Sequence, residues 1–278
     1  MTRPAALCLW VIGGLGVTLA GTDPVTQVLA LGVAWALLFR RKAPERRLRA
    51  LAIGLAVVTA VTVIVNGMLN HVGATVMDTM PSWVPLIGGP ITAEGFAQGA
   101  DIAVGMVAAI SVAATLSIVI DPADLVDALP HPLERTGAAL GAALNLVPAT
   151  AASVVAVRDA QRLRGWRPRG PRAMVDLAVP VILGAIERST QLAESMEARA
   201  FGSGPRTKSA QESRTGRNAA VGALALLALA VLTATRLEGT VSPWAAYPTP
   251  IPPSFAPSAL APAILLGLAA FLVPAASC

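Results

Sequence analysis

Charged residues are scarce in this 278-residue chain: they make up 13% of it, whereas hydrophobic residues make up 55%. A typical soluble domain carries about 25% charged residues. Bilayer residence is the simplest way to tolerate such a deficit, because apolar side chains can then face lipid. Long runs of Leu, Ala and Val also argue against disorder, despite 22 Pro and 24 Gly. The composition therefore predicts an integral membrane protein.

Cysteine and histidine are also rare. Each occurs twice, as Cys8 and Cys278 near the two ends of the chain and as His71 and His131 in separate segments. Both cysteines lie near the face predicted below to be cytoplasmic, where a disulfide between them is not expected. No cluster has metal-ligand spacing, and no G-x-x-x-x-G-K-[ST] phosphate loop is present. The sequence thus predicts no catalytic residue, no metal site, no cofactor and no enzyme activity.

Long apolar stretches are abundant in the chain. A helix that crosses a bilayer needs about 20 mostly apolar residues. The candidate spans are residues 5–20, 24–40, 48–70, 96–120, 219–236 and 258–275. The first has a single basic residue before it and no convincing cleavage site after it, so we expect a retained helix rather than a signal peptide. We therefore predict an all-α, polytopic membrane protein with about six transmembrane helices.

The basic residues are distributed unevenly along the chain. Segments 40–49, 158–172 and 199–217 hold 17 of the 21 Lys and Arg residues, whereas 71–95 and 237–257 hold none. The positive-inside rule places 40–49 and 121–217 in the cytoplasm. Topology accounts for the net charge of +5, so no nucleic-acid partner is expected.

Three regions follow from this pattern. Residues 1–120 are an N-terminal transmembrane bundle, 121–217 a cytoplasmic domain, and 218–278 a C-terminal transmembrane hairpin. The cytoplasmic domain contains a short amphipathic helix at 121–130 and two long helices at 134–165 and 173–200, with Pro148 and Pro180 inside them. A polar linker is expected at 206–217.

Each long helix is predicted to end in an arginine between small or apolar residues, as Leu163-Arg164-Gly165 and Ala198-Arg199-Ala200. Small neighbours allow a helix end to approach another surface, and the guanidinium suits bidentate carboxylate pairing. An aromatic residue follows each arginine, Trp166 or Phe201, and can anchor in a partner pocket. The pattern suits docking to two soluble subunits or to two sites on a dimer. Ordinary positive-inside arginines beside lipid are the alternative.

Two of these stretches resemble a known family. "AQRLRG" (160–165) and "ESMEARAFG" (194–202) look like the paired Ala-Arg-Gly motifs of the transmembrane T component of energy-coupling factor transporters. "DPADLVDAL" (121–129) and "LNLVPATAASVVAVRDAQ" (144–161) are similar to that family's approach to the first motif. The resemblance covers roughly residues 100–205 and, more loosely, the N-terminal bundle.

The resemblance implies a role without catalysis. In that family the T component joins a substrate-binding S component to two ABC-type ATPases, or to an ATPase homodimer, and its arginine motifs lie in grooves on the ATPases. Arg164 and Arg199 would be the coupling arginines. The other positions that align with the two motifs are Gln161, Leu163, Gly165, Met196, Glu197, Ala198 and Ala200. The implied activity is vitamin or transition-metal uptake across the plasma membrane of a bacterial-type cell.

The chain departs from the family pattern at three positions. Ala200 replaces the usual glycine, Leu163 replaces the usual alanine, and Thr190 stands where a glutamate is common. The first two changes are expected to alter how closely each helix end approaches its groove. Both arginines are retained.

Two other functions compete with this prediction. A stand-alone secondary transporter or channel would use Asp101, together with Asn66, Asn70 and His71, as its polar pathway, since acids inside a membrane are functional candidates. A hydrated helix end is the simpler interpretation of the Asn66–Asn70–His71 cluster. A lipid-modifying membrane enzyme would need clustered acids or a His/Asp group at the membrane face, and the acids of 121–127 lack the expected neighbours.

Overall fold

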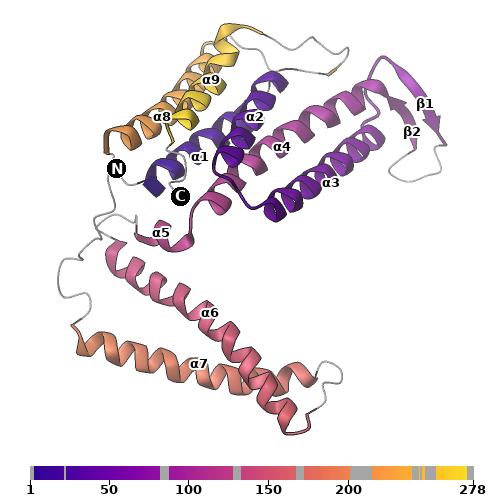
Figure 1. Cartoon of the computed structure of the whole chain (residues 1–278). Helices are drawn as coiled ribbons and strands as arrows, with labels where there is room; N and C mark the ends of the chain where they lie inside the picture. Colours follow the sequence, from indigo (N-terminus) through magenta and orange to yellow (C-terminus); the bar gives the residue numbers. More distant parts are fainter. Residues whose placement is uncertain are drawn as a thin grey trace. The chain divides into compact units, whose positions relative to one another are not determined.

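The structure is a computed structural model that describes residues 3–21, 23–81, 88–127, 133–166, 172–200, 215–239, 244, 246–247 and 255–273. Among these residues, helices dominate and one small sheet is present (Figure 1). The elements are α1 (Arg3–Ala20), α2 (Pro24–Arg40), α3 (Glu45–Leu69), β1 (Val76–Met80), β2 (Gly89–Thr92), α4 (Ala93–Val119), α5 (Pro122–Asp127), α6 (Glu134–Leu163), α7 (Arg172–Ala198), α8 (Thr215–Leu237) and α9 (Pro257–Leu272).

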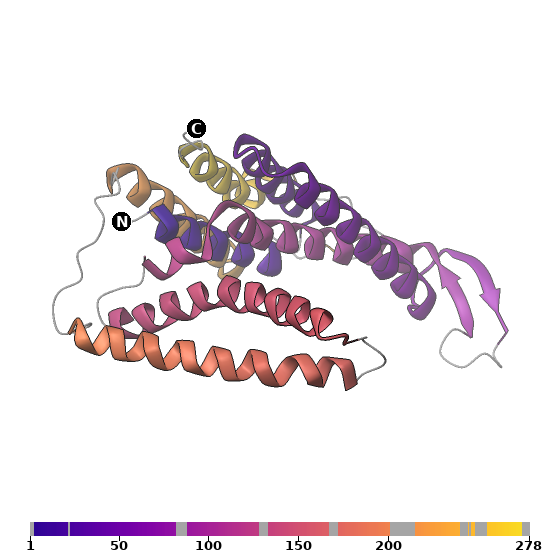
Figure 2. The same ribbon diagram turned by 60° about the horizontal axis from the view of Figure 1, so that its bottom comes forward.

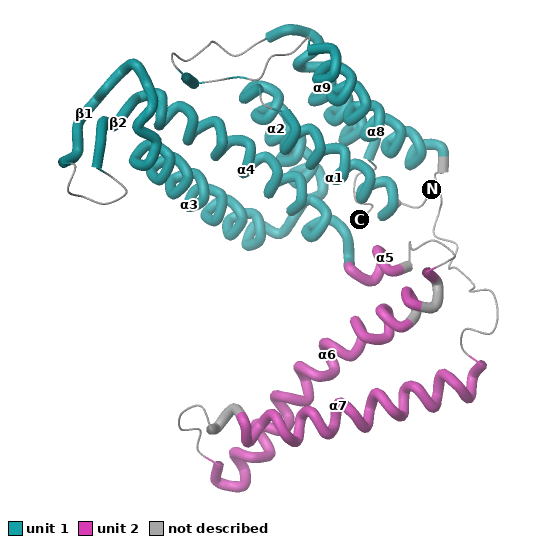
Figure 3. Tube along the Cα trace, turned by 180° about the vertical axis from the view of Figure 1, so that it is seen from behind, with its two compact units in different colours: residues 1–121, 212–278 teal, residues 122–211 magenta. Residues whose placement is uncertain are grey.

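The chain divides into two compact units (Figure 3). Unit 1 comprises residues 1–121 and 212–278, and therefore contains α1 to α4, the sheet, α8 and α9. Unit 2 comprises residues 122–211 and contains α5, α6 and α7. Unit 2 is thus inserted between two segments that together build unit 1.

The predicted all-α membrane fold is confirmed. Four stretches of described helix are long and apolar enough to cross a membrane: α3, α4, residues 139–163 of α6 and residues 216–237 of α8. Helices α1, α2 and α9 are apolar but shorter. Six of these seven helices coincide with predicted spans. The exception is α6, in which an 18-residue stretch reaches a mean hydropathy of 1.8, a high value for a helix predicted to be cytoplasmic.

The core of unit 1 is built around α1, which packs against α2, α4, α8 and α9 (Figures 1 and 2). Trp10 is 1% exposed, and its indole N–H donates to the carbonyl of Leu266 at 3.1 Å. A Cβ at Gly13 would stand 2.7 Å from the carbonyl oxygen of Ala225. Glycine therefore allows the backbones of α1 and α8 to approach closely, as small residues do between membrane helices.

Arginine side chains cap the carboxyl ends of two helices in unit 1. Arg40 donates to the carbonyls of Ala270 and Phe271, and Arg217 donates to that of Leu272, all in the last turn of α9. Arg236 caps α1 at Ala20 with a 2.7 Å bond. Cations at these positions also interact favourably with the helix dipole.

The polar linker ends earlier than predicted. The sequence predicts a linker through residue 217, whereas α8 begins at Thr215. Arg217 is therefore a capping residue of the bundle. Arg206, predicted in the same linker, lies outside the described residues.

A two-stranded hairpin occupies the loop between α3 and α4. Strands β1 and β2 are antiparallel, with Val76 opposite Thr92 and Met80 opposite Gly89. The hairpin is fastened to α4 by Glu94, which is 2% exposed and accepts the backbone N–H of Thr75 at 3.0 Å. The Thr92 hydroxyl caps α4 by accepting the N–H of Gly95. The all-α fold predicted from the sequence includes no such sheet.

Tyr247 lies within reach of the charge at the same end of α4. Burial and, secondarily, the charge of Glu94 raise the pKa of Tyr247.

Unit 2 is a pair of long helices with α5 beside the start of α6. Helices α6 and α7 run in opposite directions (Figures 1 and 2). Both continue through an internal proline, Pro148 in α6 and Pro180 in α7. Val126 of α5 is 6% exposed and lies against Gly141 of α6.

Candidate functional site

The first arginine motif forms the carboxyl end of α6. The N–H of Arg164 donates to the carbonyls of Ala160 and Gln161, and the N–H of Trp166 reaches back to Gln161 at 3.0 Å. Gly165 has a φ of +79°, the left-handed conformation that commonly follows a helix. This turn stops the helix at Arg164 and leaves that side chain exposed.

The second motif ends α7 in a related way. The N–H of Arg199 donates to Ser195, and the N–H of Ala200 donates to Glu197 at 2.9 Å. Ala200 has a φ of +51°. The same left-handed position that glycine occupies after Arg164 is thus held by alanine after Arg199, where a Cβ is disfavoured. The departure at Ala200 therefore has a physical consequence: it adds backbone strain at the end of α7.

The remaining motif residues separate into exposed and partly buried sets. Leu163 is 90% exposed, and Glu197 and Ala198 are exposed as well. Gln161 and Met196 are partly buried. Each motif thus presents its arginine outward and turns one residue back toward its own unit.

The structure does not bring the two arginines together. Because α6 and α7 run in opposite directions, Arg164 and Arg199 lie at opposite ends of the helix pair (Figures 1 and 2). One groove on a partner could not hold both. The arrangement offers two separate arginine-tipped ends.

Trp166 has a partner within unit 2. Its indole N–H donates to the Asp176 carboxylate of α7 at 3.2 Å. This contact ties the end of α6 to the second turn of α7, and it differs from the predicted role of Trp166 as an anchor for a partner pocket. Phe201, the aromatic residue of the second motif, lies outside the described residues.

Sequence reasoning missed Arg188. Its guanidinium donates to the Ala149 carbonyl at 3.3 Å and to the Ser153 hydroxyl at 2.8 Å, so it joins the middle of α7 to α6. Counting helical periods places Arg188 on the same face of the helix as Leu177, Val181 and Leu192, but its partners on α6 do not follow from such a count.

The polar residues at the end of α3 are bonded locally. Asn70 donates to the Asn66 side chain, Asn66 donates to the carbonyl of Thr62, and a ring nitrogen of His71 pairs with the carbonyl of Pro90. These bonds agree with the simpler interpretation of this cluster as a helix end. Each side chain has a structural partner.

Asp101 of α4 differs from that cluster. Its Oδ1 and the Oε1 of Gln27 on α2 are buried and have no hydrogen-bond partner among the described residues. A Cβ at Gly105, one turn beyond Asp101, would lie 3.0 Å from the Gln27 side chain. The interface of α2 and α4 therefore contains polar groups that are separate from the two arginine motifs.

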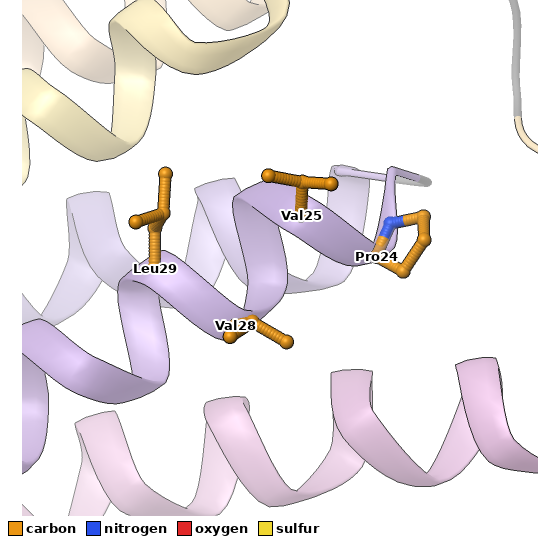
Figure 4. A pocket seen from close by; sticks show the side chains of 4 residues that line it. All are labelled: Pro24, Val25, Val28 and Leu29. Atoms are coloured by element: carbon orange, nitrogen blue, oxygen red, sulfur yellow. The ribbon is translucent and has the colours of Figure 1, made fainter. Parts of the chain in front are cut away.

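A depression of about 240 Å³ lies on α2, lined by Pro24, Val25, Val28 and Leu29 (Figure 4). All four lining side chains are apolar, so it suits a hydrocarbon chain better than an ion. Within the described parts of the chain, no three His, Cys, Asp or Glu residues are grouped so that they could hold a metal ion. Cys8 is a free thiol, and Cys278 lies outside the described residues.

The apolar helices described above agree with the class of protein that a comparison with protein families gives, a membrane transport protein. The model of the CbiQ family, described as cobalt transport protein, matches residues 4–212. The chain belongs to this family, which confirms its predicted resemblance to the T-component family. No curated protein matches the sequence.

Proposed function

We propose that this protein is the transmembrane coupling subunit of an ATP-driven importer. Its partners are two ABC-type ATPase subunits, or a homodimer, and a substrate-binding S component in the plasma membrane of a bacterial-type cell. Closure of the ATPases moves Arg164 and Arg199, and the long helices transmit the movement to the S component. Membership of the cobalt transport family favours a transition metal as cargo, with a vitamin as the alternative.

One observation carries this proposal: two exposed arginines end two antiparallel helices, each followed by a residue in the left-handed conformation. A guanidinium held at a helix end can enter a groove and pair with a carboxylate in bidentate geometry. Two such ends facing opposite ways suit two ATPase subunits.

The test replaces the arginines in the assembled complex. Removing one member of a buried charge pair costs about 2–5 kcal/mol, much of it from the stranded partner charge. Arg164→Ala or Arg199→Ala should therefore weaken ATPase association by about 30-fold or more. The double variant should lose cobalt uptake altogether. Arg→Lys should restore function only in part, because ammonium lacks the planar fork.

The matched control is Arg158→Ala, since Arg158 is an exposed arginine of α6 outside the motif. Arg217 is unsuitable, because it caps α9. Normal assembly and uptake in the double variant would refute the coupling role. A stand-alone transporter would depend instead on the buried polar pair, so Asp101→Asn should abolish uptake in that case and have little effect in ours.

A further inference from the structure

The contact face of α7 is a stripe of apolar residues with one exception. Between Val175 and Ala200, the side chains that are at least partly buried recur every three or four positions. They are Leu177, Pro180, Val181, Gly184, Ala185, Arg188, Leu192 and Met196. Arg188 is the single charged member of this stripe. A lone polar residue in an apolar helix seam commonly sets the register of the two helices.

Arg188 meets a side-chain hydroxyl that a slide of one turn in either direction would remove, because Ala149 and Val157 stand one turn from Ser153. Its two donors reach the Ala149 carbonyl and the Ser153 hydroxyl, which are one turn apart on α6. A slide of one turn toward the carboxyl end of α6 would place Val157 where Ser153 now lies. The guanidinium would then face an apolar side chain and lose a charge-assisted bond, and such bonds are stronger than neutral ones.

The position of this contact relative to the motifs is symmetrical. Ser153 stands eleven residues before Arg164, and Arg188 stands eleven residues before Arg199. Eleven residues are about three helical turns, or roughly 16 Å. Because the helices run in opposite directions, the contact lies midway between the two arginines. Their separation along the pair is then at most about 33 Å.

Both contact faces continue to the motifs. On α6 the partly buried positions Ser153 and Val157 lead to Gln161, and on α7 Arg188 and Leu192 lead to Met196. After three whole turns a residue returns to nearly the same face, so a slide or rotation at Arg188 would be carried to both helix ends.

We infer that Arg188 is a positioning residue that sets the register of α7 on α6 and thereby the spacing of the two coupling arginines. The inference rests on the proposed coupling role of Arg164 and Arg199. Arg188 itself touches no ATPase. It keeps the two docking ends at one separation, so that both can engage the ATPases at once.

The direct test measures that separation in the full-length protein. Spin labels at exposed positions of the last turns, Arg162→Cys and Ser195→Cys, report the distance in a background without the two native cysteines. Arg188→Ala should broaden the distance distribution or shift it by about 5 Å, the length of one turn. Arg188→Lys and Ser153→Ala should each show a smaller change. Arg158→Ala, the matched control, should show none.

A second readout follows coupling in the complete complex. In Arg188→Ala, the cobalt transported per ATP hydrolysed should fall several-fold while the ATPases remain bound. Ser153→Ala should add little to Arg188→Ala, because both act through the same bond. If Arg188→Ala prevents assembly, the comparison is made with Ser153→Ala, which leaves the charge in place.

An unchanged distance distribution in Arg188→Ala would overturn the inference. So would an altered distribution with unchanged transport per ATP. Failure of the proposed function looks different: the Arg164→Ala and Arg199→Ala double variant would assemble and transport normally, while the spin-label distance would still report the register.

Discussion

In unit 1, buried side chains from α1, α2, α4, α8 and α9 form one continuous apolar cluster that includes Trp10, Leu37, Val221 and Leu266. In unit 2, the buried hydrophobic side chains among the described residues are Val126 and Val181. The outward faces of its helices carry apolar residues such as Val147 at 65% exposure and Leu183 at 59%. Large exposed apolar surface marks sites of contact with proteins or membranes.

The difference shows two ways of using apolar sequence. Unit 1 has a core of its own, and its remaining apolar surface suits lipid. The described part of unit 2 has so little core that its helices need cover from outside the unit. A coupling element held between an ATPase and a membrane subunit would have such cover on both sides, and it could shift without breaking a core.

The largest expected effect concerns the side of the membrane on which unit 2 lies. Three exposed positions are suitable for single cysteine substitutions: Thr79 of β1, and Thr136 and Asp159 of α6. With an impermeant thiol reagent applied to intact cells, Thr79→Cys should label, whereas Thr136→Cys and Asp159→Cys should not. Labelling of one α6 position from outside would mean that α6 crosses the membrane, as its hydropathy permits. The contrast between a membrane-embedded unit 1 and a cytoplasmic unit 2 would then be wrong.

A smaller effect, opposite in sign between the units, is expected for Gly→Ala. At Gly13 the new methyl group would meet the Ala225 carbonyl at 2.7 Å, and such overpacking costs about 1–3 kcal/mol. At Gly184 of α7 the nearest atom is a guanidinium nitrogen 3.8 Å away. Alanine there should stabilise the helix by up to about 1 kcal/mol. Hydrogen exchange of the purified chain should become faster in α1 for Gly13→Ala and slower in α7 for Gly184→Ala.

Slower exchange in α1 of Gly13→Ala would show that α1 and α8 are not in close contact. The core assigned to unit 1 would then be wrong.

The smallest expected effect concerns the two helix ends of unit 2, where glycine follows Arg164 and alanine follows Arg199. Relieving the left-handed alanine with Ala200→Gly should stabilise the last turn of α7 by about 1 kcal/mol, and Gly165→Ala should destabilise the last turn of α6 by a similar amount. Exchange of the Arg199 and Arg164 amides measures both. Equal exchange in Ala200→Gly and the parent would show that alanine is not strained there.

Much of the fold follows from hydropathy, because a span must be apolar over its whole length. That requirement locates the helices of unit 1 to within a few residues. The hairpin at 76–92 escapes the same reasoning, because its strands are short and the signal in "MPSWVPLIGGP" indicates only turns. Its attachment depends on Glu94, whose partner Thr75 is 19 residues away.

The residues of the candidate site also fall into those that the sequence predicts and those that it does not. The arginines and their small neighbours are adjacent in sequence, so their place at helix ends could be predicted, and Gly165 signals the end of α6 directly. Arg188 and Asp176 act through pairings between helices, with Ser153 and Trp166, that depend on how α6 and α7 align. No local pattern specifies that alignment.

The bond between Trp10 and Leu266 has a consequence for biosynthesis. Its partners are 256 residues apart, so at about 5–20 residues per second the ribosome completes the second roughly 10–50 s after the first. During that delay the whole of unit 2 is made. Of the helices that pack against α1, only α2 and α4 have been synthesised by then, so the face that contacts α8 and α9 is still uncovered. The packing of α1 is therefore completed only when α9 has been made. A nascent chain interrupted after unit 2 leaves the indole N–H of Trp10 in the bilayer without its acceptor.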